Sequence, residues 1–171
     1  MCPARKGTVQ SDSDFDLDTT GWNPRLTRLY GYWCAIRPPG GLLPGRRHFD
    51  PVDVPELLSG IWLLDIHREP FRMRYRLVGT GIVEAIGHEV TGRWFDEAHP
   101  GMMESPDFVA RYRRVVERGA PDRRKGRPRL WVHRDFDVIE NLLLPFASDG
   151  RHVDMICAYS VLYRPDGSVA Y

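Results

Sequence analysis

The stretch Phe71–Leu77 (FRMRYRL) most limits what this chain can fold into, because four apolar residues alternate strictly with three arginines. A period of two is that of a β-strand, whose successive side chains point to opposite faces, so the three arginines share one face. A strand buried inside a parallel sheet is a continuous apolar run instead. The alternation therefore predicts a sheet with a solvated side and argues against a doubly wound nucleotide-binding fold.

The residues after this strand begin like the dinucleotide fingerprint G-x-G-x-x-G, but Glu84 stands in place of the third glycine. Later segments favour hairpins over strand-helix-strand units, so a dinucleotide site is disfavoured. We interpret Gly79 and Gly81 as the residues that let the chain turn sharply from the strand into a short helix, because glycine tolerates backbone angles that other residues resist.

Helix signals precede the arginine-bearing strand. Asn23 and Pro24 are typical of an N-cap and a first helical turn, and apolar residues follow at helical spacing until a Pro/Gly-rich stretch at 38–41. A short helix is expected at 53–60 and an apolar strand at 61–67. Residues 1–22 are polar and are expected to form a flexible tail, so that the N-terminal helix and its connection occupy 23–60.

The second half of the chain predicts one longer helix and three strands. Ser105 and Pro106 open the helix and Gly119 closes it, around an apolar stripe. A tight turn joins the last two strands. The three strands are expected at 127–133, 137–147 and 152–163. This order of elements is that of an α+β fold.

Composition excludes several classes of protein. The 171 residues suit one domain, and a net charge of +1 implies no general attraction to a charged partner. The sequence lacks a run of about 18 apolar residues and a secretory h-region, so we expect a cytoplasmic protein without membrane insertion. The three cysteines form no C-x-x-C pair, and we expect reduced thiols, with Cys34 and Cys157 in the core.

Several stretches, YRLVGTGIVEAIGHEVTG and LLLPFASDGRHVDMICAYSVLY among them, occur in an order that resembles the PAS family of small sensory domains. With LYGYW and LPGRRHFDPVDVPELL, the chain is more closely similar to stand-alone bacterial PAS proteins. The resemblance implies a core at 61–165 with a five-stranded antiparallel sheet, helices on one face around a small pocket, an N-terminal amphipathic helix, and a C-terminal tail at 166–171. It implies sensing or protein association in signal transduction, not catalysis.

The resemblance also raises the question of a cofactor. Flavin photosensors of the family carry a reactive cysteine after the short helices, and the matching region, 88–97, has none, so a flavin photocycle is disfavoured. Haem-binding members use a histidine on or near the longer helix, which makes His88 and His99 candidate ligands. A histidine beside a proline, such as His99, is more typical of a cap or a surface. We expect no bound cofactor and, from the dispersed histidines, no metal site.

Alternation and the helix stripe, together with the resemblance, suggest a pocket for a small ligand. Arg76 could anchor an acidic group of that ligand, or could pair with Asp65 or Glu84 and hold the corner between strand and helix. The candidate pocket residues are Met73, Tyr75, Arg76, Ile82, Ile86, His88, His99, Phe108, Tyr112 and Leu142.

Positive charge is concentrated between residues 111 and 134, where nine arginines and one lysine face two acidic residues. An anionic partner could use the loop Arg123–Arg129, since guanidinium groups match phosphate geometry. A phosphate-binding or nucleic-acid-binding module is therefore the competing function, although one nearby aromatic, Trp131, is a weak nucleic-acid signal. Alternatively, these charges only solvate a helix face and a loop. The candidate anion-binding residues are Arg123, Arg124, Lys125 and Arg127.

The aromatic side of the N-terminal helix has two interpretations. It could form the seam of a homodimer, or it could cover the open face of its own sheet; the candidate dimer residues are Leu26, Leu29, Tyr30 and Trp33. Either way we expect a sensory or adaptor domain that acts through a signalling partner. Asp96, Glu97 and His99 could form an acid-base cluster, but without a nucleophile motif we expect no enzyme.

Overall fold

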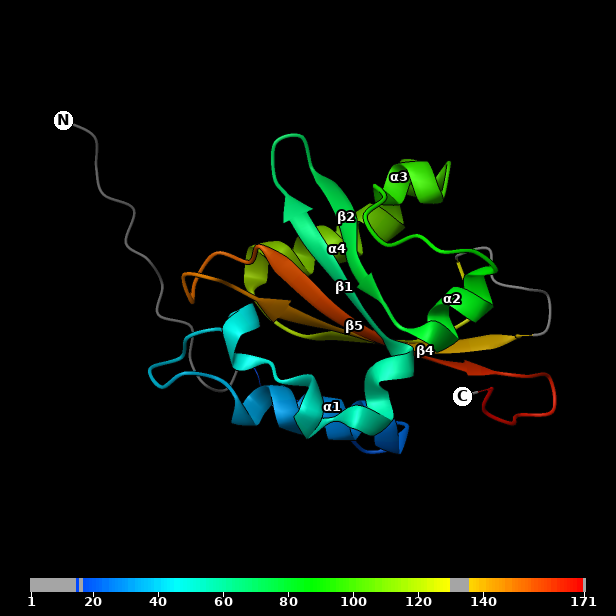
Figure 1. Ribbon diagram of the computed structural model, residues 1–171, viewed down its shortest axis with the longest axis horizontal. Coiled ribbons are helices and arrows are strands. Elements are labelled where there is room, and N and C mark those ends of the chain that lie inside the picture. The colour runs from blue at the N-terminus through cyan, green and yellow to red at the C-terminus, as the bar shows by residue number, and fades with distance from the viewer. Residues whose placement is uncertain (1–14, 16, 130–135, 171) are drawn as a thin grey trace.

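The computed structural model describes residue 15 and residues 17–129 and 136–170. Its centre is a five-stranded antiparallel sheet in the order β2-β1-β5-β4-β3, which confirms the predicted α+β class (Figure 1). Every neighbouring pair of strands is antiparallel. The strands are β1 (Ile61–His67), β2 (Arg72–Val78), β3 (Asp122–Gly126), β4 (Val138–Phe146) and β5 (Met155–Tyr163).

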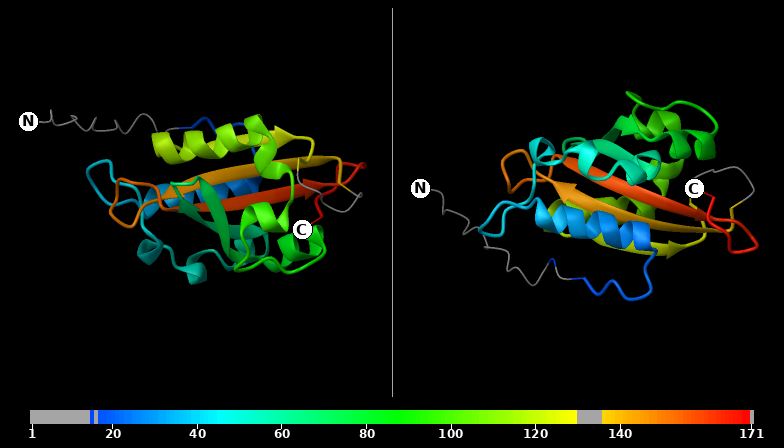
Figure 2. Two further views of the ribbon diagram at one scale, coloured as in Figure 1. Left: turned by 90° about the horizontal axis from the view of Figure 1, so that it is seen from above. Right: turned by 60° about the horizontal axis from the view of Figure 1, so that its bottom comes forward.

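Helices cover both faces of the sheet (Figure 2). One face, which we call the cavity face, lies under α2 (Thr80–Ile86), α3 (Phe95–Ala98) and α4 (Pro106–Arg118), with the short turn η5 (Met102–Glu104) between the last two. The other, the α1 face, lies under α1 (Pro24–Ala35) and three short 3₁₀ segments, η2 (Arg46–His48), η3 (Pro51–Asp53) and η4 (Pro55–Gly60). The short helix expected at 53–60 corresponds to the last of these segments.

Helix α1 covers its own sheet. The side chain of Asn23 accepts a hydrogen bond from the Arg25 amide at 3.0 Å, which caps the helix as the sequence predicts. The indole of Trp33 donates to the Pro145 carbonyl of β4 at 3.0 Å. The four candidate dimer residues, Leu26, Leu29, Tyr30 and Trp33, are between 0 and 7% exposed. Of the two interpretations, the structure shows the intramolecular cover.

The segment before α1 also joins the core. Phe15 is buried, and its ring lies 5.8 Å from that of Trp33. The amide of Leu17 donates to the Tyr30 hydroxyl, and Trp22 packs against the ring of the same tyrosine. The expected tail at 1–22 is therefore too long, because its aromatic residues complete the apolar cover over α1. Residues 1–14 lie outside the described part of the chain.

Strand β2 follows the predicted alternation only as far as Tyr75. Met73 and Tyr75 are buried and Arg74 is exposed. Leu64 of β1 pairs with Tyr75 but Leu63 pairs with Leu77, which leaves Arg76 as an extra residue in β2. Such a bulge reverses the alternation. Leu77 is consequently 44% exposed, and its prediction as an inward residue is wrong.

The glycine after this strand is needed for a different reason from the one expected. Gly79 has an ordinary φ of −67°, so it does not relieve a strained backbone. A Cβ at this position would lie 2.2 Å from the Leu58 carbonyl oxygen, which leaves no room for a side chain. The short helix that the sequence predicts here is present as α2, and η4 packs against its start.

The third strand lies earlier than predicted. β3 spans Asp122–Gly126, whereas the sequence favoured 127–133. Residues 127–129 are not in a strand, and 130–133 lie outside the described residues. The error arose because β3 is polar and occupies a sheet edge, where pairing with β4 alone can hold a strand that lacks an apolar pattern. Residues 123–126 of the expected loop Arg123–Arg129 therefore lie in a strand.

The two candidate core cysteines both pack against apolar side chains. Cys157 is buried in β5, and burial raises the pKa of its thiol to about 12, so the thiol stays protonated at neutral pH. Cys34 is half-buried and packs against the core. Cys2 lies outside the described residues.

Candidate ligand-binding site

A stack of aromatic rings fills most of the space between β2 and the helices on the cavity face. The ring of Tyr75 lies 5.4 Å from that of Phe95, which lies 5.2 Å from Phe108; Phe108 in turn lies 4.7 Å from Tyr112. These rings come from β2, α3 and α4, so the stack ties three elements together. The predicted pocket is for the most part a packed core.

His99 belongs to this core. Its Nε2 shares a 2.8 Å hydrogen bond with the Tyr75 hydroxyl, and its ring lies 4.9 Å from Phe95. Burial, and then the charges of His88 and Arg93, lower the pKa of His99 to about 4, so the ring is neutral at pH 7. Haem does not fit here, because Nε2 is engaged and aromatic rings occupy the adjacent space. His88, the other candidate ligand, is exposed.

The described residues on this face line two small cavities. The larger, the α4 cavity, measures about 40 Å³ and is lined by the aromatic side chains of Trp62, Phe108 and Tyr112 and by Arg111, Arg124 and Arg129. The smaller, the α2 cavity, measures about 20 Å³ and is lined by Tyr75, Ile82, Ala85 and Ile86, among others. Trp62 and Ile139 line both, so the two cavities share these walls.

The structure gathers some of the candidate pocket residues and separates others. Tyr75, Ile82 and Ile86 line the α2 cavity, and Phe108 and Tyr112 line the α4 cavity. Met73 is buried in the core cluster. Arg76 lies on the surface, where its Nη1 donates to Asp65 at 2.8 Å, one of the two pairings considered for it.

Leu142 needs a correction. It pairs with Tyr159 in the β4-β5 ladder, and its neighbour Asn141 points to the cavity face, where Asn141 contacts Arg111. Because successive side chains of a strand alternate, Leu142 points to the α1 face. The sequence shows that this strand is buried on both sides but not which residues face which helix. For the same reason sequence reasoning missed Ile139 and Asn141.

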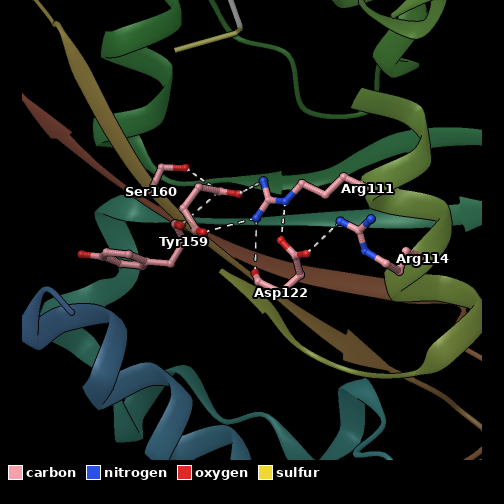
Figure 3. Close-up of polar contacts among 6 residues, drawn as sticks. Arg111, Arg114, Asp122, Tyr159 and Ser160 are labelled. Carbon is pink, nitrogen blue, oxygen red and sulfur yellow. Dashed lines mark hydrogen bonds and ion pairs between the residues drawn. The ribbon is translucent and has the colours of Figure 1, made fainter. Parts of the chain in front are cut away.

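A polar network forms the floor of the α4 cavity (Figure 3). Arg111 of α4 makes a close ion pair with Asp122 of β3 and donates to the Asn141 side-chain oxygen at 2.8 Å. The Asn141 amide nitrogen donates to the Ser160 hydroxyl at 3.0 Å and to the Tyr159 carbonyl at 3.1 Å. These bonds join α4 to three neighbouring strands.

Two further arginines at the α4 cavity have no acidic partner among the residues that the structure describes. Arg124 of β3 donates to the Arg127 carbonyl at 2.6 Å, and Arg129 makes no ion pair within the described part. Burial, and then the positive charges of Arg129 and Arg111, lower the pKa of the Arg124 guanidinium. The cavity therefore holds cations that disfavour one another.

The other two basic residues of β3 serve the opposite face. Glu140 of β4 is fully buried; Arg123 binds it at 2.8 Å, and Lys125 lies 3.6 Å from it. The Tyr163 hydroxyl and the Asn23 amide also donate to Glu140. Burial by itself would raise the pKa of Glu140, but the bonds from Arg123, Asn23 and Tyr163 outweigh it, and the pKa is lowered.

Strand alternation thus divides the candidate anion-binding residues. Arg123 and Lys125 pair with Glu140 on the α1 face, Arg124 turns to the α4 cavity, and Arg127 is exposed. Arg129, which the sequence set did not include, joins Arg124 instead. A single continuous basic loop is therefore absent from the described residues.

The candidate acid-base cluster is not assembled either. Arg72 binds Asp96 at 2.8 Å and Glu97 at 3.3 Å on the surface, and its guanidinium stacks on Trp94. His99 lies inside with Tyr75. Within the described ranges, no three His, Cys, Asp or Glu side chains gather as a metal site. The helices in those ranges are too short or too polar to cross a membrane.

The fold and site together define a class: an antiparallel five-stranded sheet with short helices and one longer helix over a largely packed core with small cavities. This is the class of small sensory domains. The sequence profile of the PAS domain matches residues 23–159, most of the chain, and the chain belongs to this family. Members serve in general as sensory and signalling modules. Among curated proteins, none matches the sequence.

Proposed function

We propose that this chain is a PAS sensory or adaptor domain that binds a small ligand on its cavity face and reports to a signalling partner without catalysis of its own. The observation that supports this most directly is the pair of neighbouring cavities that share Trp62 and Ile139. Cavities of this size hold only about one to three water molecules. A larger ligand therefore binds a state in which these walls have moved, and binding shifts the population toward that state.

The bonds around β3 offer a route from the ligand to the opposite face. On the cavity side, Asp122 and Arg124 face the α4 cavity and its floor. On the other side, Arg123 binds Glu140, which also accepts the amide hydrogen of Asn23 at the start of α1. A shift of β3 would change both sets of contacts, so that α1 and its surroundings would present a different surface to a partner protein.

Dimerisation and location remain parts of the proposal. A homodimer would need a seam other than Leu26, Leu29, Tyr30 and Trp33, since these side chains are buried within one chain. The cytoplasmic, stand-alone bacterial setting remains a prediction from the sequence. The phosphate-binding or nucleic-acid-binding alternative loses support, because Arg123 and Lys125 pair with Glu140.

The test is to narrow the cavities from their shared wall. Ile139→Phe places a ring where both cavities meet, and Val138→Phe is the matched control, because Val138 is the neighbouring half-buried residue of β4 and points away from the cavity face. Indole and phenol serve as small probes, and the indole N–H resonance of Trp62 reports their binding by NMR. We expect a saturable shift in the wild type and in Val138→Phe but not in Ile139→Phe.

Two results would contradict this proposal. One is the absence of a saturable Trp62 response to either probe in the wild type, together with native mass spectra that contain no co-purified small molecule. The other is a probe affinity that Ile139→Phe leaves unchanged, since a probe whose binding does not depend on the shared wall does not occupy the cavities. The melting temperature of each variant is measured alongside, so that loss of binding is separated from loss of fold.

A further inference from the structure

We propose that the α4 cavity takes a small organic acid, with an apolar or aromatic body against Trp62, Phe108 and Tyr112 and a carboxylate held by Arg124 and Arg129. This inference rests on the proposed ligand-sensing function and names the chemical class of the ligand. It also gives Arg124 and Arg129 a role that differs from that of Arg123 and Lys125, which pair with Glu140.

Among the described residues, positive charge exceeds negative charge at the α4 cavity. Arg111 is matched by Asp122, which also lies 3.3 Å from Arg114. Arg124 and Arg129 have no such partner among the described residues, and the pKa of Arg124 is lowered because burial and two like charges disfavour its cation. A bound carboxylate would relieve this repulsion, and guanidinium groups bind carboxylates through paired hydrogen bonds.

Asn141 and Trp62, two other residues with polar groups at the cavity, already have hydrogen-bond partners within the chain. The side-chain oxygen of Asn141 accepts from Arg111, and its amide nitrogen donates to Ser160 and to the Tyr159 carbonyl. The indole N–H of Trp62 donates to the same Ser160 hydroxyl at 3.2 Å. The cavity therefore offers aromatic contact from Trp62, Phe108 and Tyr112, and cationic donors from Arg124 and Arg129.

The size of the site limits the ligand further. The cavity measures about 40 Å³, which is room for about three water molecules. Typical small-molecule sites measure roughly 300–1,000 Å³, so a ligand of about one ring binds only the state in which the shared walls, Trp62 and Ile139, have moved. Three aromatic side chains line this space and can pack against the faces or edges of such a ring. The apolar body lies inward and the acid group lies toward Arg124 and Arg129.

The test compares acids with amides of nearly the same shape. The probe pairs are benzoate with benzamide, phenylacetate with phenylacetamide, and hexanoate with hexanamide, each titrated at neutral pH while the Trp62 indole resonance is followed. We expect at least one acid to bind about tenfold or more tightly than its amide, which is the effect typical of hydrogen bonds to a charged group. Inorganic phosphate, which lacks an apolar body, is expected to bind more weakly than that acid.

Variants then assign the preference to the two arginines. Arg124→Gln and Arg129→Gln are each expected to reduce the ratio of acid to amide affinity several-fold. Arg113→Gln is the matched control: this exposed arginine of α4 stacks on Phe71, 4.4 Å away, and does not line the cavity. It should keep the wild-type ratio. If Arg124→Gln does not fold, Arg124→Lys retains the charge without the guanidinium fork and is expected to lower the ratio partially.

The outcomes separate this inference from the proposed function. If amides bind as tightly as acids, the site binds ligands but the assignment of an acid is overturned. If the preference for acids survives both Arg124→Gln and Arg129→Gln, the arginines do not hold the carboxylate, and the inference fails. If neither acids nor amides shift the Trp62 resonance in the wild type, the ligand-binding function fails with it. Phosphate that binds as tightly as the best acid overturns the role of the apolar body.

Discussion

The two faces of the sheet differ in how completely their polar groups are paired. On the α1 face, Glu140 is buried and receives hydrogen bonds or charge from four groups, and α1 seals it from solvent. On the cavity face, Arg124 and Arg129 lie beside small cavities without an acidic partner among the described residues. The first arrangement suits a scaffold, because pairing is complete. The second suits a site, because a ligand can complete it.

The largest effect is expected from breaking the paired face. Glu140→Gln removes the charge that Arg123 and Lys125 share and leaves a buried amide among donors. We expect unfolding free energy to fall by about 3 kcal/mol, as when one partner of a buried ion pair is lost. Urea denaturation measures it. Asp65→Asn is the control, since Asp65 binds a half-exposed Arg76 and its loss should cost under about 1 kcal/mol. Equal losses in both variants would show that burial adds nothing to the contacts of Glu140 and would contradict its role in the scaffold.

The next effect separates packing from binding. Leu142→Ala opens a space under α1 and is expected to cost about 3 kcal/mol, typical of a fully buried leucine, while cavity ligands bind as before. Ile139→Ala lies in the same strand but lines both cavities and is half-buried, so it should cost less and admit larger probes. Urea denaturation and Trp62 titrations measure the two quantities. A change in probe affinity with Leu142→Ala alone would show that Leu142 does act at the cavities.

A smaller effect depends on pH and sharpens the account of the cavity face. The pKa of His99 is about 4 in the folded chain against 6.5 for a free histidine, so the unfolded chain binds the extra proton first as the pH falls. Unfolding free energy should therefore decrease from about pH 6.5 downward, by about 2 kcal/mol at pH 5, from this group alone.

The variant that checks this pH effect is His99→Phe, whose ring suits the aromatic stack. It loses the hydrogen bond to Tyr75 at every pH, so the informative quantity is the difference in pH slope between wild type and variant. Urea denaturation at pH 7, 6 and 5 measures it. Identical slopes would mean that His99 is not held neutral by its surroundings.

Much of the fold could be predicted from local patterns. The Asn23 and Pro24 start of α1, the Ser105 and Pro106 start of α4 and the last hairpin each depend on a few neighbouring residues, and the structure has all three. The polar strand β3 could not be predicted in this way, because it is held by pairing with β4 at a sheet edge. Because β3 includes residues 123–126 of the basic segment, their side chains alternate between the two faces of the sheet.

The candidate site could be predicted only in part, for a related reason. Tyr75, Phe108 and Tyr112 carry a clear inward signal and line the cavities. Leu142 was assigned to the wrong face, and Leu77 was displaced by the bulge at Arg76. Where a strand is apolar on both sides, alternation separates its two sets of residues but cannot say which set meets which helix.

The sequence by itself determined most elements of this protein, their order and the α+β class, because helix caps, turns and the period of two in β2 are properties of short segments. Only the tertiary structure decided that Arg123 and Arg124, adjacent in the chain, point to opposite faces of the sheet. It also decided that Arg129 lines the same cavity as Arg124. The reason is physical: the face that a side chain meets depends on strand register and on the helices packed above it, and both are set by residues distant in the sequence.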